Sequence, residues 1–136
     1  MADALRWGIL GTGTIAAKFA KDLLASKTGR LVAVGSRSAE SAQRFGRDFL
    51  PETPINRHST YDALLADPTV DVVYISTPHP FHGQWSIRAA LAGKHILCEK
   101  PLALNYADAM TVVEAAQITY FSWKPSCIAV IRSWSD

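Results

Sequence analysis

The chain has 136 residues, of which 49% are hydrophobic and 19% are charged, and its formal net charge at pH 7 is +2. This composition predicts one folded domain with a real core, and so small a charge argues against nucleic acid or a membrane surface as a partner. Cys98 and Cys127 form neither a disulfide framework nor a metal-ligand spacing, so we expect reduced thiols in the cytoplasm.

The first apolar stretch, Leu5–Leu10, is predicted to be a strand that runs through a glycine turn into a helix over 14–26. Gly11 permits a sharp turn, Gly13 lets a ligand approach the backbone, and Ala16 allows the helix to pack against the strand. This is the Gly-x-Gly-x-x-Gly/Ala pattern of dinucleotide-binding units, in which the helix N-terminus suits a pyrophosphate. The predicted pyrophosphate-binding residues are Gly11, Thr12, Gly13, Thr14 and Ile15. The alternative is a turn that binds no ligand.

The second predicted strand, Leu31–Gly35, ends in Ser36, Arg37 and Ser38. An NAD-binding unit usually carries Asp or Glu here, about 20 residues beyond the glycines, to bind the ribose 2′-hydroxyl. An arginine flanked by serines instead suits a 2′-phosphate, because the guanidinium pairs with it and the hydroxyls donate hydrogen bonds. We therefore predict NADP rather than NAD. The alternative is that Arg37 is only a solvated surface charge.

The rest of the chain continues to alternate between helices and strands. In chain order we predict a helix from Ser38 to before Pro51, a weak strand over 54–58, a small helix over 61–65, a strand over 70–76, a helix over 81–92, a strand over 94–98 and a helix over 106–116. This alternation predicts an α/β fold with a Rossmann-type, doubly wound parallel sheet of order 3-2-1-4-5. The ligand crevice is expected outside the carboxyl ends of the first and fourth strands, lined by residues 11–15, 36–37 and 77–82, with 99–100 close by.

Three segments carry a resemblance to a known family. They are Gly-Thr-Gly-Thr-Ile-Ala, Ser-Thr-Pro-His-Pro-Phe-His and, most specifically, Ala-Gly-Lys-His-Ile-Leu-Cys-Glu-Lys-Pro-Leu-Ala. From Leu5 to Gln117 the chain resembles the N-terminal, cofactor-binding half of the glucose-fructose oxidoreductase / inositol dehydrogenase (Gfo/Idh/MocA) family. Its Ser-Arg-Ser segment is similar to the branch with NADP-dependent dihydrodiol and D-xylose dehydrogenases.

This resemblance implies an oxidoreductase that transfers hydride to or from a sugar or other secondary alcohol. It implies that Glu99 helps to hold the nicotinamide ribose and that Lys100 is the catalytic residue, pointing toward the reacting oxygen and aimed by a cis bond before Pro101. Without the resemblance, Lys-Pro is better interpreted as a turn that ends a strand. The remaining predicted cofactor-binding residues, at the crevice after the fourth strand, are Thr77, Pro78, His79 and His82. The family often has histidine at the position of His82, whereas His79 replaces its frequent asparagine.

His79 and His82 also suggest a metal site, because their spacing could fit one helical turn. No nearby cysteine or acidic cluster completes a ligand set, so we predict no metal. We expect His82 to lie at the start of a helix and to face the cofactor crevice.

The resemblance ends at residue 117, so we predict a dinucleotide-binding domain over 1–117 and a divergent tail over 118–136. In the tail, Cys127–Ile131 could add a short strand, and Trp123 and Trp134 are candidates for exposure. The family's C-terminal α+β substrate domain has no counterpart here, so we expect a truncated or alternatively spliced product or an imperfect gene model, with homo-oligomers only when that domain is present. The alternatives are a non-catalytic NADP-binding or redox-sensing module and an inactive fragment.

Overall fold

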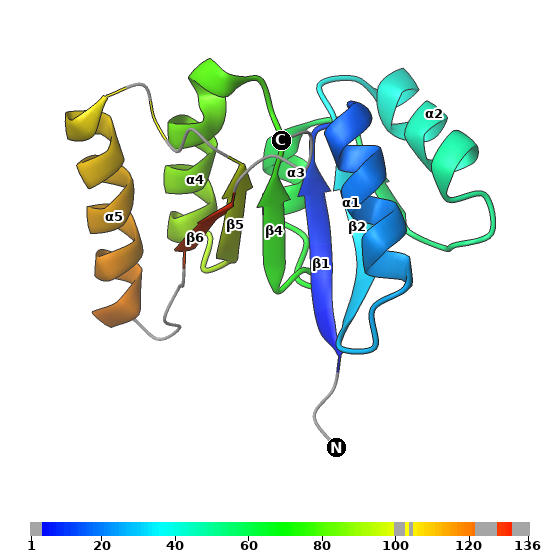
Figure 1. Ribbon diagram of the computed structural model, residues 1–136, viewed down its shortest axis with the longest axis horizontal. Helices are drawn as coiled ribbons and strands as arrows, with labels where there is room; N and C mark the ends of the chain where they lie inside the picture. Colours follow the sequence, from blue (N-terminus) through cyan, green and yellow to red (C-terminus); the bar gives the residue numbers. More distant parts are fainter. Residues whose placement is uncertain (1–3, 100–102, 104, 122–127, 132–136) are drawn as a thin grey trace.

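A computed structural model describes residues 4–99, 103, 105–121 and 128–131 (Figure 1). Six parallel strands form one sheet in the order β3-β2-β1-β4-β5-β6. The strands are β1 (Leu5–Leu10), β2 (Gly29–Gly35), β3 (Asn56–His58), β4 (Val72–Ile75), β5 (His95–Glu99) and β6 (Ile128–Ile131). The helices are α1 (Thr14–Leu24), α2 (Ala39–Phe49), α3 (Tyr61–Leu65), the 3-10 turn η1 (His79–Phe81), α4 (His82–Leu91) and α5 (Tyr106–Phe121). The predicted doubly wound α/β fold is confirmed, and the order of its first five strands is as expected.

Alternation along the strands divides the core into two layers. In β1, Ile9 packs with α1 and α2, whereas the next residue, Leu10, packs on the opposite face with α3 and α4. In β4, Tyr74 faces α1, while Val73 and Ile75 face the other layer. Because both faces are covered, residues 31–35 of β2 and all of β4 are apolar, as is typical of parallel sheets.

Capping residues define the ends of several helices. Ser38 Oγ accepts from Ser41 N at 3.1 Å at the start of α2, and Thr60 Oγ1 accepts from Ala63 N at 3.0 Å at the start of α3. Asn105 Oδ1 accepts from Asp108 N at 2.9 Å in the first turn of α5. Gly93 takes a positive φ of 77° just after α4, as a glycine after a helix often does. Side chains thus satisfy backbone amides in the first turns of α2, α3 and α5, and a glycine follows the end of α4.

Several predicted boundaries differ from the structure. β4 begins at Val72 rather than at residue 70, because Asp71 is engaged by Arg6 of β1, whose side chain donates at 3.0 and 2.9 Å. The first helix ends at Leu24 rather than at 26, since Ser26 Oγ accepts from the amides of Thr28 and Gly29. Residues 79–81 form a separate 3-10 turn ahead of α4.

The C-terminal part of the chain contributes to the same sheet. α5 continues to Phe121, beyond the expected end at residue 116, and β6 pairs with β5 in parallel, with Cys98 opposite Val130. The short strand expected over 127–131 is therefore confirmed over Ile128–Ile131. Trp123, Cys127 and Trp134 lie outside the described residues. No helix in the described part of the chain is long and apolar enough to cross a membrane.

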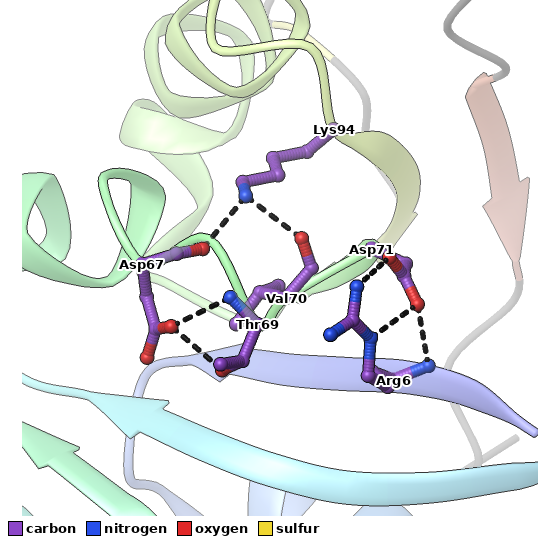
Figure 2. A network of polar contacts seen from close by, with 6 residues as sticks. All are labelled: Arg6, Asp67, Thr69, Val70, Asp71 and Lys94. Atoms are coloured by element: carbon purple, nitrogen blue, oxygen red, sulfur yellow. Dashed lines mark hydrogen bonds and ion pairs between the residues drawn. The ribbon is translucent and has the colours of Figure 1, made fainter.

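A cluster of polar contacts connects the loop between α3 and β4 to neighbouring segments of the chain (Figure 2). The Lys94 ammonium, on a residue only 8% exposed, donates to the carbonyls of Asp67 at 2.8 Å and Val70 at 2.7 Å. The Asp67 carboxylate accepts from Asn56, His58 and Thr69, so it also links this loop to β3. Buried polar groups that are satisfied in this way fix one loop conformation, and with it the start of β4.

Candidate functional site

A cavity lies at the carboxyl ends of β1, β2 and β4, where the order of the strands reverses. It measures about 690 Å³, within the range of ligand pockets in general. In open α/β sheets this is the place where ligands bind. The residues that line it are Gly11, Thr12, Gly13, Ser36, Arg37, Ser38, Ser41, Tyr61, Ser76, Thr77 and Pro78.

The glycine turn that follows β1 places its two glycines in different surroundings. Gly11 has a φ of 109°, and a Cβ there would lie only 2.8 Å from Ser76 Oγ. A Cβ on Gly13 would meet no atom within 4 Å, so this backbone is open to a ligand. Gly13 is also the N-cap of α1 and supplies no side-chain hydrogen bond to the first turn. The helix therefore keeps amide donors and its positive dipole end for an anion.

The end of β2 supplies a cationic and hydroxyl-rich wall. Ser36 is 5% exposed, with its Oγ 3.5 Å from Thr12 Oγ1, and Arg37 and Ser38 follow it along the cavity. Burial raises the pKa of Tyr61, and the nearby Arg37 charge partly offsets that rise. The lining residues, all in the described part of the chain, include no Asp or Glu, so this wall suits a negatively charged group.

The end of β4 supplies a buried hydroxyl. Thr77 is 3% exposed, and its Oγ1 has no hydrogen-bond partner among the described residues. Its carbonyl accepts from His82 Nε2 at 2.6 Å, so His82, 1% exposed, anchors the segment that carries Thr77. A buried hydroxyl costs free energy unless it finds a partner, so Thr77 Oγ1 suits a ligand group in the cavity.

Other predicted site residues do not line this cavity. Thr14 and Ile15 open α1, and His82 opens α4 as expected but is buried against Thr77. His79 begins the turn before α4. Glu99 ends β5, where its carboxylate accepts a hydrogen bond from Tyr74 Oη. Lys100 and Pro101 lie outside the described residues. No group of three or more potential metal-ligating side chains forms among the residues that the structure describes.

Three lining residues were not predicted from the sequence: Ser41, Tyr61 and Ser76. Ser41 was detectable, because it follows the Ser38 cap within the first turn of α2. Ser76 was detectable as the residue directly after β4, at the edge where ligands bind. Tyr61 opens α3, whose approach to the crevice depends on tertiary packing that no local pattern reports.

Comparisons with known proteins agree with this geometry. The family model described as "Oxidoreductase family, NAD-binding Rossmann fold" (Gfo/Idh/MocA) matches residues 5–119. The chain belongs to this family. Within it, a D-xylose 1-dehydrogenase (NADP(+)) from Hypocrea jecorina is 40% identical over 126 residues, which is 83% of this chain and 31% of that protein.

Two further proteins are similar to this chain. The trans-1,2-dihydrobenzene-1,2-diol dehydrogenase of Mus musculus is 38% identical over 117 residues, 84% of this chain and 34% of that one. The structure of KijD10, a 3-ketoreductase from Actinomadura kijaniata in complex with NADP, matches with a TM-score of 0.80 and 30% identity, covering 96% of this chain and 38% of that one. The chain thus spans about a third of the length of these relatives.

Proposed function

We propose that this domain binds NADP at the crevice and serves an oxidoreductase that acts on a sugar or another secondary alcohol. The observation that carries the proposal is the wall after β2, where Arg37 stands between two serines and the lining residues include no carboxylate. A carboxylate there would repel a 2′-phosphate, whereas a guanidinium pairs with it.

Each part of the cavity has a matching group on the cofactor. The N-terminus of α1, left open at Gly13, would bind the pyrophosphate. Arg37, with Ser36 and Ser38 beside it, would bind the 2′-phosphate. A hydrogen bond to a charged group contributes roughly 1.5–3 kcal/mol, so Arg37 alone is enough to favour NADP about tenfold. Thr77 Oγ1 would find its missing partner on the bound molecule.

The substrate class is supported by the relatives. Their names refer to the dehydrogenation of a sugar, the dehydrogenation of a diol and the reduction of a ketone. Bound NADP would supply the hydride acceptor for such an alcohol. From the resemblance, Lys100 would place its ammonium beside the reacting oxygen, where it stabilises the alkoxide-like charge. Glu99 would hold the nicotinamide ribose.

The direct test is calorimetric titration of the 136-residue chain with NADP and, separately, with NAD. We expect NADP to bind at least about ten times more tightly, because only NADP carries the group that Arg37 pairs with. Equal or tighter binding of NAD would overturn the choice of cofactor. Failure of both nucleotides to bind at millimolar concentration would overturn the function itself.

A further inference from the structure

The carboxylate of Glu99 is buried at the carboxyl edge of the sheet. The residue is 5% exposed. One oxygen, Oε1, accepts from Tyr74 Oη, while the other, Oε2, has no hydrogen-bond partner among the described residues. A buried carboxylate oxygen without a donor is costly. Tyr74 therefore holds Glu99 by its Oε1, while Oε2 can still accept a hydrogen bond.

The strand register places Glu99 on a particular face of the sheet. Tyr74 of β4 lies opposite Leu97 of β5, so Glu99, two residues further on, shares the face of Tyr74 and Leu97. That face is covered by α1, since Tyr74 packs with Ala16, Phe19 and Ala20. Glu99 thus lies on the same side of the sheet as α1.

This placement relates Glu99 to the half of the dinucleotide that lies away from Arg37. If the 2′-phosphate pairs with Arg37 after β2 and the pyrophosphate lies at the N-terminus of α1, the remaining half must extend across the switch point. The strands on that side are β4 and β5. Glu99 at the end of β5 therefore belongs to the nicotinamide half of the site, and not to the adenosine half.

Tyr74 is held firmly in place. It is fully buried, and its ring stacks on Phe19 with centroids 3.9 Å apart and planes inclined by 13°. Phe19 in turn meets the edge of Trp7 at 5.4 Å. Burial and the neighbouring Glu99 carboxyl raise the pKa of Tyr74 above its usual value, so the phenol stays protonated and donates at ordinary pH. Aromatic packing leaves this hydroxyl little freedom to leave Glu99.

We propose that Tyr74 is a positioning residue, whose hydroxyl holds the Glu99 carboxylate in the orientation that binds the nicotinamide ribose. The inference rests on the proposed binding of NADP. Tyr74 itself lies beneath the site in the α1 layer of the core and acts only through Glu99. We therefore expect that removal of the Tyr74 hydroxyl weakens binding of the nicotinamide half of NADP and leaves binding of the adenosine half unaffected.

The experiment compares two probes, NADP and adenosine 2′,5′-bisphosphate, which has the 2′-phosphate but no nicotinamide ribose. In Tyr74→Phe, which keeps the ring and removes the hydroxyl, we expect the Kd for NADP to rise about tenfold and the Kd for the bisphosphate to change less than about twofold. Glu99→Gln should show the same selective loss. The double variant should be no weaker than Glu99→Gln, because the two residues act as one unit. Tyr106→Phe, at a tyrosine that is 79% exposed, is the matched control and should leave both affinities unchanged.

Other outcomes separate this inference from the proposed function. If Tyr74→Phe weakens the binding of both probes equally, or of neither, the positioning role of Tyr74 is wrong, while the proposed NADP site is not contradicted. If the unaltered chain binds neither probe, the proposed function fails and takes this inference with it. Should Tyr74→Phe not fold, Glu99→Gln tests the premise of the proposal, since equal loss of both probes would place Glu99 outside the nicotinamide half and overturn the proposal.

Discussion

At the scale of single residues, the two glycines of the first turn lie in different surroundings. Gly11 has a positive φ and lies against Ser76, so its constraint comes from the protein itself. Gly13 has an ordinary φ of −85° and open space around it, so nothing in the described structure requires a glycine there. Its constraint is expected to come from the ligand.

The two substitutions to alanine should therefore separate folding from binding. Gly11→Ala is expected to lower the free energy of unfolding by about 1–3 kcal/mol, because alanine is strained at this φ and meets Ser76. Gly13→Ala should change it by less than about 1 kcal/mol, as at an exposed N-cap, yet weaken NADP binding. Urea unfolding and calorimetric titration measure the two effects. Full NADP affinity in Gly13→Ala would contradict the close approach of the pyrophosphate.

At the scale of elements, the loop between α3 and β4 depends on one buried carboxylate. The Asp67 side chain is 4% exposed and accepts four hydrogen bonds, from Asn56, His58 and twice from Thr69. Burial raises the pKa of Asp67, but these donors outweigh burial and hold it well below its usual range. The Arg6 hydrogen bonds likewise lower the pKa of Asp71 at the start of β4.

Asp67→Asn should lower the free energy of unfolding at pH 7 by roughly 1.5–3 kcal/mol, since donors now face an amide in place of a charged acceptor. Because the pKa of Asp67 is lower in the folded chain than in the unfolded chain, its carboxylate stabilises the fold above the unfolded pKa of about 3.9. This contribution to the free energy of unfolding is lost as the pH falls below that value. The variant should therefore lose less stability between pH 7 and pH 3 than the original chain does. Urea unfolding at several pH values measures both.

Asp62→Asn is the matched control for this loop. Asp62 pairs with Arg88 at the surface, where its side chain is 66% exposed, so its removal should cost less than about 1 kcal/mol. If Asp67→Asn were no more destabilising than Asp62→Asn, the carboxylate would not be what holds the loop.

At the scale of the whole molecule, the fold was predictable because its signals are periodic and local. Runs such as Leu31–Gly35 alternate with amphipathic helices, and this alternation admits few topologies. Part of the cavity lining was predictable, because Arg37 and Thr77 each lie two residues beyond the carboxyl end of a strand. Tyr61 was not, because α3 reaches the crevice through its packing against β1 and β2.

The buried polar contacts were not predictable either, because they too depend on tertiary packing. Tyr74 and Glu99 are 25 residues apart, and their hydrogen bond follows from the register of two adjacent strands. The sequence predicts both strands, but a buried tyrosine on an apolar strand carries no sign of its partner. His82 was likewise expected at the start of a helix, whereas its bond to the Thr77 carbonyl depends on the turn at residues 79–81.

In the proposed function, the Arg37 guanidinium selects the phosphorylated adenosine of NADP. The most direct test is the ratio of the Kd values for NAD and NADP in the original chain and in Arg37→Asp, with Arg47→Ala as a control at an exposed arginine of α2. We predict that Arg37→Asp weakens NADP binding about tenfold or more without weakening NAD, while Arg47→Ala leaves the ratio unchanged. An unchanged ratio in Arg37→Asp would contradict the account.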